Sequence, residues 1–181
     1  MIERVAPFRQ LLGSFEPASG SDVAKSKFAE LIESVRDPFD EHNYRPGHIT
    51  ASGFVLSPDA SALLLIHHRR LGMWLQPGGH VDPVDVDVLA AARREVAEET
   101  AVSELVLETP GIFDLDVHPI PGRSGVDPHY HYDVSFLFRA PSWDMAAADE
   151  VLDARWVAID EASAISDDRP LARVLAWLGA G

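Results

Sequence analysis

Three glutamates near the middle of the chain are spaced so that a helix would bring their carboxylates together. Glu95, Glu98 and Glu99 fall within roughly 100° of one another around a helix axis, because an α-helix turns about 100° per residue. Such crowding costs a few tenths of a kcal/mol per exposed pair of like charges, and a divalent cation would remove that cost. Oxygen ligands favour a hard ion such as Mg²⁺ or Mn²⁺. The alternative is a solvated acidic helix face, which is common.

The helix that would carry these glutamates is predicted over residues 88–100. Apolar side chains such as Val96 occupy the neighbouring sector and are expected to pack on a sheet. Arg94 lies four residues before Glu98, the spacing at which an ion pair forms on one helix face. The preceding run GGHVDPVDVD (78–87) supplies a glycine pair and an acidic loop.

The segment 79–102 resembles the Nudix box, whose pattern is G, five residues, E, seven residues, then R-E-U-x-E-E-x-G-U, with U aliphatic. Gly79 opens the segment, five residues lead to Asp85, and the run 94–99 matches the helical part of the pattern residue by residue. Three positions differ. Asp85 takes the place of glutamate, eight residues rather than seven separate it from the arginine, and Ala101 takes the place of glycine.

The resemblance implies an α/β fold, namely an α/β/α sandwich with a mixed β-sheet, and hydrolysis of a diphosphate linked to another moiety. By position it implies that Glu98 and Glu99 bind a metal and that Glu95 is a third ligand or the partner of one. The carbonyl of Gly78 would be a further ligand, and Arg94 would orient a carboxylate. The expected cofactor is Mg²⁺, with Mn²⁺ as a substitute. Such ions neutralise phosphate charge and lower the pKa of a bound water, from which a carboxylate takes the proton.

Two positions outside the motif are further candidates for the site. Proteins of this family often use a carboxylate from a late loop, and Glu150 is preferred here over its neighbour Asp149. The alternative is an ordinary exposed acidic turn. Trp74 precedes the glycine pair and is expected either to stack on a substrate base or to pack in the core.

The acidic loop offers two aspartates for one position of the motif. Asp85 keeps the family's distance from Gly79 and is expected to face the loop, where its loss would raise the metal requirement and leave stability nearly unchanged. Asp87 lies two residues closer to the helix, where a carboxylate can accept hydrogen bonds from unpaired backbone N–H groups. It is therefore predicted to cap the helix by bonding to the amide of Leu89 or Ala90.

The segment 116–134 carries histidines at two strand ends, around a loop rich in glycine and proline. On an extended strand His129, His131 and Asp133 share one face, because successive side chains point to opposite faces. One interpretation is a wall that contacts the substrate, formed by His118, His131 and Asp133. Two alternatives stay open. One is a polar strand face with satisfied histidines, and the other is a transition-metal site of His118, His129 and His131, which no spacing signature supports.

The hydrophobic pattern along the rest of the chain predicts the helices and strands that position the candidate site residues. Ser21 or Asp22 is expected to cap a helix that reaches Val35, and residues 1–44 are predicted to form a helical extension ahead of a domain spanning 45–181. Strands interspersed with helices imply a mixed sheet covered by helices. The predicted strands are 48–57 and 62–68, which form a hairpin, then 73–79, 103–108, 111–120, 130–139 and 154–159, followed by a helix at 169–179.

Composition excludes several classes of protein. Fifteen Lys and Arg against 29 Asp and Glu give a net charge of −14, which argues against a nucleic-acid polymer as partner because binding its backbone needs clustered Lys and Arg. No apolar run reaches the roughly 18–20 residues that cross a bilayer, and the N-terminus lacks the apolar stretch of a signal peptide. The chain has no cysteine, so a disulfide or thiolate metal site is excluded and a cytoplasmic enzyme is expected.

Two functions fit these observations. The first is a metal-dependent hydrolase that cleaves a diphosphate linkage in a nucleoside diphosphate derivative or a similar small phosphorylated metabolite. The second is a non-catalytic sensor of the same fold that binds a nucleotide-like ligand. The clustered glutamates favour catalysis, since a pure binder does not need them. Isomerase chemistry on a prenyl diphosphate would call for a cysteine base, and the chain has no cysteine, so this activity is disfavoured. The N-terminal extension is expected to cap the site, to mediate formation of a homodimer, or to stabilise the core.

Overall fold

The computed structural model describes residues 3–16, 22–166 and 168–179. The chain divides into two compact units, and each unit is assembled from three segments. The first unit comprises Met1–Ala51, Gly79–Ala92 and Pro110–Phe136, and the second comprises Ser52–Gly78, Arg93–Thr109 and Leu137–Gly181. Four elements contribute residues to both units, namely β1 (Gly47–Leu56), β4 (Gly78–His80), α3 (Val88–Thr100) and β7 (His129–Arg139).

The second unit is built around a sheet with the strand order β3–β2–β1–β7–β5. Strand β2 pairs in the antiparallel direction with β1, β3 and β8, and β5 pairs in the same way with β7. The predicted hairpin of β1 and β2 is present, and its turn is held by Ser57 Oγ, which accepts hydrogen bonds from the amides of Ser61 and Ala62. The bounds are β2 (Ala62–His68), β3 (Met73–Leu75), β5 (Val106–Leu107) and β8 (Val151–Ala158).

Strands β1 and β7 run parallel to each other. Near their starts the amide of Tyr130 donates to the carbonyl of Pro46 at 3.1 Å, and just beyond the end of each the amide of Ala140 donates to the carbonyl of Leu56 at 2.9 Å. Both strands therefore advance in the same direction between the two bonds. Because the pairings of β2 with β1, β3 and β8 and of β5 with β7 are antiparallel, the sheet is mixed, and the predicted α/β class with a mixed sheet is confirmed.

Helix α3 has the bounds predicted from the sequence. It begins after Asp87, whose Oδ1 accepts a hydrogen bond from the amide of Ala90 at 2.7 Å, so the predicted cap is confirmed. Its fully buried Val96 packs against Gly53 of β1, where an added Cβ would lie 2.7 Å from Val96 Cγ2. A side chain at this position of β1 would clash with Val96, so glycine lets the helix approach this closely.

Loss of the α3 cap is expected to cost stability. Replacing Asp87 with Ala removes the bond to the amide of Ala90, and we expect the free energy of unfolding to fall by about 1 kcal/mol in a urea titration. The matched control is Asp87→Asn, whose side-chain oxygen can accept the same bond and should preserve most of the stability. Equal losses in the two variants would show that the cap is not the cause.

Ala101 follows α3 in the left-handed region, with φ of 58°. This conformation costs a residue with a Cβ about 1–2 kcal/mol, whereas the extra freedom of glycine in the unfolded chain costs about 0.4–1 kcal/mol. We therefore expect Ala101→Gly to raise the free energy of unfolding by about 0.5–1 kcal/mol, measured by urea denaturation. As a control, Ala97→Gly in the interior of α3 should lower it by about 1 kcal/mol. Destabilisation by both variants would contradict the assigned strain.

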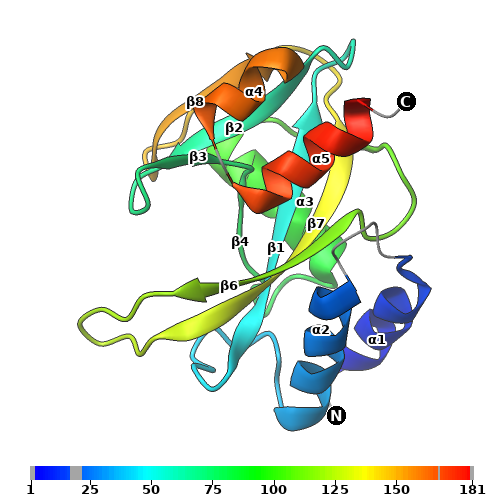
Figure 1. Cartoon of the computed structure of the whole chain (residues 1–181), viewed down its shortest axis with the longest axis vertical. Coiled ribbons are helices and arrows are strands. Elements are labelled where there is room, and N and C mark those ends of the chain that lie inside the picture. The colour runs from blue at the N-terminus through cyan, green and yellow to red at the C-terminus, as the bar shows by residue number, and fades with distance from the viewer. Residues whose placement is uncertain (1–2, 17–21, 167, 180–181) are drawn as a thin grey trace. The chain divides into compact units, whose positions relative to one another are not determined.

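The second unit ends in two helices, α4 (Ile159–Ile165), which packs on β2 and β8, and α5 (Arg169–Gly179). Figure 1 shows α4 beside β2 and β8, and α4 also packs on α5. Helix α4 was not predicted, and the predicted strand 154–159 begins earlier and ends one residue earlier than expected. Asp160 and Glu161 lie in the first turn of α4, where acidic side chains favour the positive end of the helix dipole.

The first unit joins two helices to a β-hairpin. Phe8 of α1 and Phe28 of α2 pack with ring centroids 6.2 Å apart, and Phe28 meets Tyr132 of β7 edge to face at 5.4 Å. Strand β6 pairs antiparallel with β7 and places His118 opposite His131. Since strand side chains alternate, the histidines lie on the face of β7 opposite to Tyr132. The bounds are α1 (Val5–Ser14), α2 (Asp22–Ser34) and β6 (Asp114–Ile120).

Other sequence expectations differ in extent from the structure. The predicted strand 73–79 is divided into β3 and β4, β5 is shorter than 103–108, and β6 starts at Asp114 rather than at residue 111. Among the described residues no helix is both long and apolar enough to cross a membrane. The boundary between a helical extension (1–44) and a domain (45–181) stays a prediction.

Candidate metal and catalytic site

The carboxylates of α3 are held by an arginine within the second unit. Arg94 Nη1 donates hydrogen bonds to Glu95 Oε1 at 2.9 Å and to Glu98 Oε2 at 2.8 Å, so the ion pair expected from the spacing of Arg94 and Glu98 is present. Glu95 is largely buried and Glu98 is half-exposed. One guanidinium thus orients two carboxylates side by side and offsets part of their repulsion.

Glu99 is the buried member of the group. Its residue is 9 % exposed, and its Oε2 accepts a hydrogen bond of 2.9 Å from the amide of Gly78 at the start of β4. Burial, together with the charges of Glu95, Glu150 and Glu98, raises the pKa of Glu99 to about 8 against the opposing effect of the Gly78 amide. The protein holds this carboxylate in a setting where a nearby cation would strongly favour its charged form.

The loop that carries Glu150 is fastened beside the end of α3. The amides of Ala146 and Ala148 donate to the carbonyls of Thr100 and Glu99 at 2.9 and 3.1 Å. These bonds satisfy carbonyls that an α-helix leaves unpaired at its C-terminus. Both Glu150 and Asp149 are exposed, but among these two only Glu150 contributes to the raised pKa of Glu99.

Arg69 fixes the backbone around Glu150 from the other side. Its Nη2 donates to the carbonyls of Asp149 at 2.8 Å and Val151 at 3.2 Å, so the backbone on both sides of Glu150 is anchored. The second unit contains all of the site residues that the motif and the late loop suggested. They are Gly78, Arg94, Glu95, Glu98, Glu99 and Glu150.

The two aspartates of the acidic loop belong to the first unit and both have structural contacts. Asp85 faces the loop as expected, and its Oδ2 accepts a hydrogen bond from the amide of Asp82 at 2.8 Å. Its residue is only 7 % exposed, however, and its carbonyl accepts a bond from Arg4 Nη1. These contacts favour a loss of stability in Asp85→Ala rather than the nearly unchanged stability expected from the sequence, because removing a buried, hydrogen-bonded carboxylate leaves its donor unpaired.

The residues proposed as a substrate-contacting wall lie in the first unit, and two of them, Asp133 and His118, contact polar groups of the protein. Asp133 is 5 % exposed and accepts hydrogen bonds from the hydroxyls of Thr50 at 2.9 Å and Ser135 at 3.1 Å. His118 Nδ1 lies 3.1 Å from Asp116 Oδ2. For Asp133 these contacts favour the alternative interpretation, a polar strand face whose side chains are hydrogen-bonded within the protein.

Two histidines that the sequence did not single out join His131. His48 on β1 and His80 on β4 bring ring nitrogens to within 4.8 Å of one another and of His131. Burial and the neighbouring imidazoles together lower the pKa of His48 to about 4 and lower that of His131 further. The three positions are 32 and 51 residues apart in the sequence, so only strand pairing brings them together.

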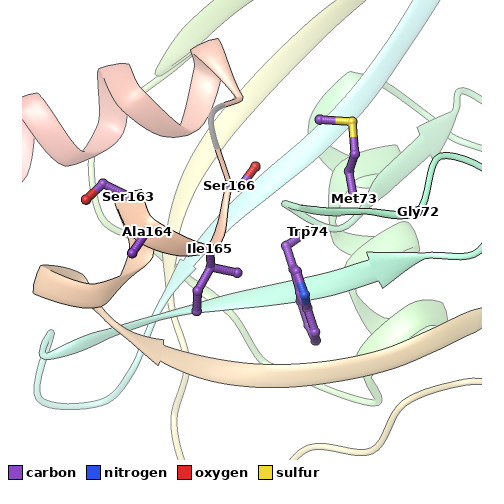
Figure 2. Close-up of a pocket in the computed structure, with 7 residues that line it drawn as sticks. All are labelled: Gly72, Met73, Trp74, Ser163, Ala164, Ile165 and Ser166. Atoms are coloured by element: carbon purple, nitrogen blue, oxygen red, sulfur yellow. The ribbon is translucent and has the colours of Figure 1, made fainter.

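Trp74 has stacking partners within the second unit. Its ring lies 5.0 Å from that of His67 at an interplanar angle of 16°, and the guanidinium carbon of Arg155 lies 4.0 Å from its centroid. Figure 2 shows Met73 and Trp74 leaving β3 in opposite directions beside a pocket of about 310 Å³. Among the described residues that line this pocket, none has an ionisable side chain. Its lining consists of Gly72, Met73, Trp74, Ser163, Ala164, Ile165 and Ser166.

Comparison with known sequences identifies one family model and related curated proteins. The family model described as NUDIX domain matches residues 46–178. A protein from Enterobacter sp. (strain 638) called "Uncharacterized Nudix hydrolase NudL" is 36 % identical over 99 residues, which cover 49 % of this chain and 50 % of that protein. A protein of the same name from Klebsiella pneumoniae is 32 % identical over 123 residues, which cover 62 % and 56 %. The chain thus matches about half the length of these curated relatives.

Comparison with solved structures supports the same fold. The binary complex of the Ap4A hydrolase from C. elegans has a TM-score of 0.55 at 20 % identity and covers 73 % of this chain and 95 % of that chain. The E. coli dihydroneopterin triphosphate pyrophosphohydrolase has a TM-score of 0.55 at 17 % identity, with coverage of 74 % and 94 %. At these identities the likeness concerns the fold alone.

Proposed function

The chain belongs to the NUDIX domain family, and we propose that it hydrolyses a diphosphate linkage in a small phosphorylated metabolite with the help of Mg²⁺, or Mn²⁺ as a substitute. The observation that carries this proposal is the position of Glu99. It is buried, and burial together with the charges of Glu95, Glu150 and Glu98 raises its pKa to about 8. A protein that only bound a ligand would gain nothing from this electrostatic cost.

The donor set of the site suits a hard divalent cation. We propose Glu98, Glu99 and the carbonyl of Gly78 as ligands, with Glu95 as a third carboxylate ligand or the partner of one. All these donors are oxygen atoms, which Mg²⁺ and Mn²⁺ prefer. When bound, such a cation would neutralise the diphosphate and lower the pKa of the attacking water. Arg94 orients Glu95 and Glu98 for this role through its two hydrogen bonds.

The proton of the attacking water needs an acceptor, and we propose Glu150. Its carboxylate is exposed, its backbone is anchored by Arg69, and its charge acts on Glu99. Glu150→Gln is expected to lower kcat by about 10²–10⁴-fold, the usual contribution of a general base. The matched control is Asp149→Asn, one residue away, which should change kcat by less than about threefold. A larger loss in Asp149→Asn would assign the role to the neighbour.

A substrate screen tests the proposed activity. The purified full chain is incubated with Mg²⁺ and nucleoside triphosphates, dinucleoside polyphosphates, nucleotide sugars or non-nucleotide diphosphates, and released phosphate or pyrophosphate is measured. The names of the C. elegans and E. coli structures support including dinucleoside polyphosphates and pterin triphosphates. We expect turnover in at least one class. Tight binding of a compound without turnover would favour the non-catalytic sensor instead.

The remaining expectations extend this proposal. We propose a small phosphorylated molecule as partner, without a nucleic-acid polymer or membrane, and a cytoplasmic location. We also propose that residues 1–44 form a helical extension ahead of the domain at 45–181, which is supported by the start of the family match at residue 46. Whether this extension mediates a homodimer, caps the site or stabilises the core is tested by its deletion, with oligomeric state, activity and melting temperature as readouts.

A further inference from the structure

A second group of potential metal ligands lies in the first unit, away in sequence from the α3 carboxylates. It consists of His48, His80 and His131, which we call the histidine cluster. Their ring centroids are 5.1 Å apart for His48 and His80, 4.9 Å for His48 and His131, and 5.5 Å for His80 and His131. The three residues come from three strands, so no single segment accounts for their meeting.

His48 supplies an unpaired nitrogen to this cluster. The residue is 1 % exposed, and its Nδ1 lies 3.3 Å from the carbonyl of Asn43, an acceptor that requires Nδ1 to carry the proton. Nε2 is then left with a lone pair, and it has no hydrogen-bond partner although it is buried. A buried polar atom without a partner is costly, and such atoms are rare in folded proteins. A cation at Nε2 would remove this cost.

The contact of His80 with an acidic side chain also follows the pattern of metal-bound imidazoles. Its Nδ1 lies 3.5 Å from Glu41 Oε2, which belongs to the connector before β1. Metal-binding histidines commonly direct one nitrogen to a carboxylate or backbone carbonyl and the other to the metal. The Asn43 carbonyl serves His48 in this way, and the Glu41 carboxylate is placed to serve His80.

We propose that His48, His80 and His131 bind a transition-metal cation, with Zn²⁺ as the first candidate. Imidazole nitrogens suit Zn²⁺ and similar ions, whereas Mg²⁺ prefers oxygen. Nitrogens bound to one tetrahedral Zn²⁺ at about 2.0–2.1 Å are about 3.3 Å apart, so nitrogens that now lie within 4.8 Å of one another need to approach by up to about 1.5 Å. The His80 side chain is 36 % exposed, which lets a water occupy a fourth position.

The site would stabilise the first unit by joining β1, β4 and β7 through one ion. It differs from the proposed Mg²⁺ site in donor type and in residues, and it does not depend on the proposed hydrolase activity. His118 and His129 lie next to His131, with centroids at 5.6 and 5.2 Å, but they are not assigned as ligands. The ligand set therefore differs from the one that the strand pattern alone suggested.

Titration with Zn²⁺ and Co²⁺ tests the proposal. Full-length protein without a histidine tag is stripped with chelator, and Co²⁺ absorbance, Zn²⁺ calorimetry and melting temperature are followed. We expect one tight equivalent per chain and a higher melting temperature with Zn²⁺. His80→Gln should weaken binding by more than about 100-fold, and Glu41→Gln by about 10–100-fold, the usual loss when the partner of a ligand is removed. Both positions are partly exposed, so the variants should fold, which circular dichroism verifies.

Two control variants separate this site from other sources of metal binding. His67→Gln, a histidine of the second unit, and Glu99→Gln should both retain the tight equivalent. The proposal is overturned if wild-type protein binds no tight equivalent, if His80→Gln binds like wild type, or if Glu99→Gln abolishes binding. The last result would assign the ion to the α3 carboxylates.

Discussion

Replacing Glu99 with Gln is expected to lower kcat/KM by at least about two orders of magnitude, the scale of losing one preorganised charge-stabilising group. The amide keeps the volume of the side chain and can still accept the hydrogen bond from the Gly78 amide. It removes the negative charge that would bind a cation. Phosphate release from a substrate identified in the screen measures the effect, and Glu161→Gln on the exposed surface of α4 is the matched control.

The same variant should be more stable than the wild type when metal is absent and the pH is high. Glu99 has a folded pKa of about 8 against an ordinary value of 4.5, so its protonated form is the one that the fold favours. Its contribution to stability is complete below pH 4.5 and is lost as the pH rises through about 8. The melting temperature of Glu99→Gln should therefore exceed that of metal-free wild type by an amount that grows from about pH 5 to about pH 9.

The loss of activity and the pH-dependent gain in stability are separate predictions, and each can fail without the other. An active Glu99→Gln protein would mean that the carboxylates of α3 are not the catalytic centre. A melting-temperature difference that does not change with pH would mean that burial does not raise the pKa of Glu99, even if activity is lost.

Removal of divalent cations is expected to abolish turnover. The donors proposed around Glu98 and Glu99 are oxygens only, and without a cation their charges would repel a diphosphate. Activity measured in excess EDTA should fall to background, and Mg²⁺ or Mn²⁺ added back beyond the chelator should restore it. Full turnover in EDTA would contradict the metal-dependent mechanism.

Local signals made α3 and its contacts predictable. The bounds 88–100, the cap at Asp87 and the pairing of Arg94 with Glu98 each depend on residues at most four positions apart. Helix periodicity and capping chemistry act over that range, so the sequence alone carries the information. The hairpin of β1 and β2 was predictable for the same reason, because the turn residues between the strands supply its hydrogen bonds.

Features that depend on tertiary contacts were harder to predict from the sequence. Two contacts of the site join segments more than 20 residues apart. The Gly78 amide donates to Glu99, and Arg69 anchors the backbone beside Glu150. Pattern alone left Glu150 and Asp149 as rivals, and it gave no reason to group His48 with His131. Strand pairing supplies that grouping, and no short spacing rule encodes it.

The most direct test of the central claim is the position of the catalytic cation in a crystal. Crystals grown with Mn²⁺ and a non-hydrolysable analogue of the substrate would be measured near the Mn absorption edge. We predict an anomalous peak within ligand distance of the Glu98 and Glu99 carboxylates, with the phosphates of the analogue beside it. An analogue bound elsewhere, with no peak at these two glutamates, would contradict the claim that α3 holds the metal at which the diphosphate is cleaved.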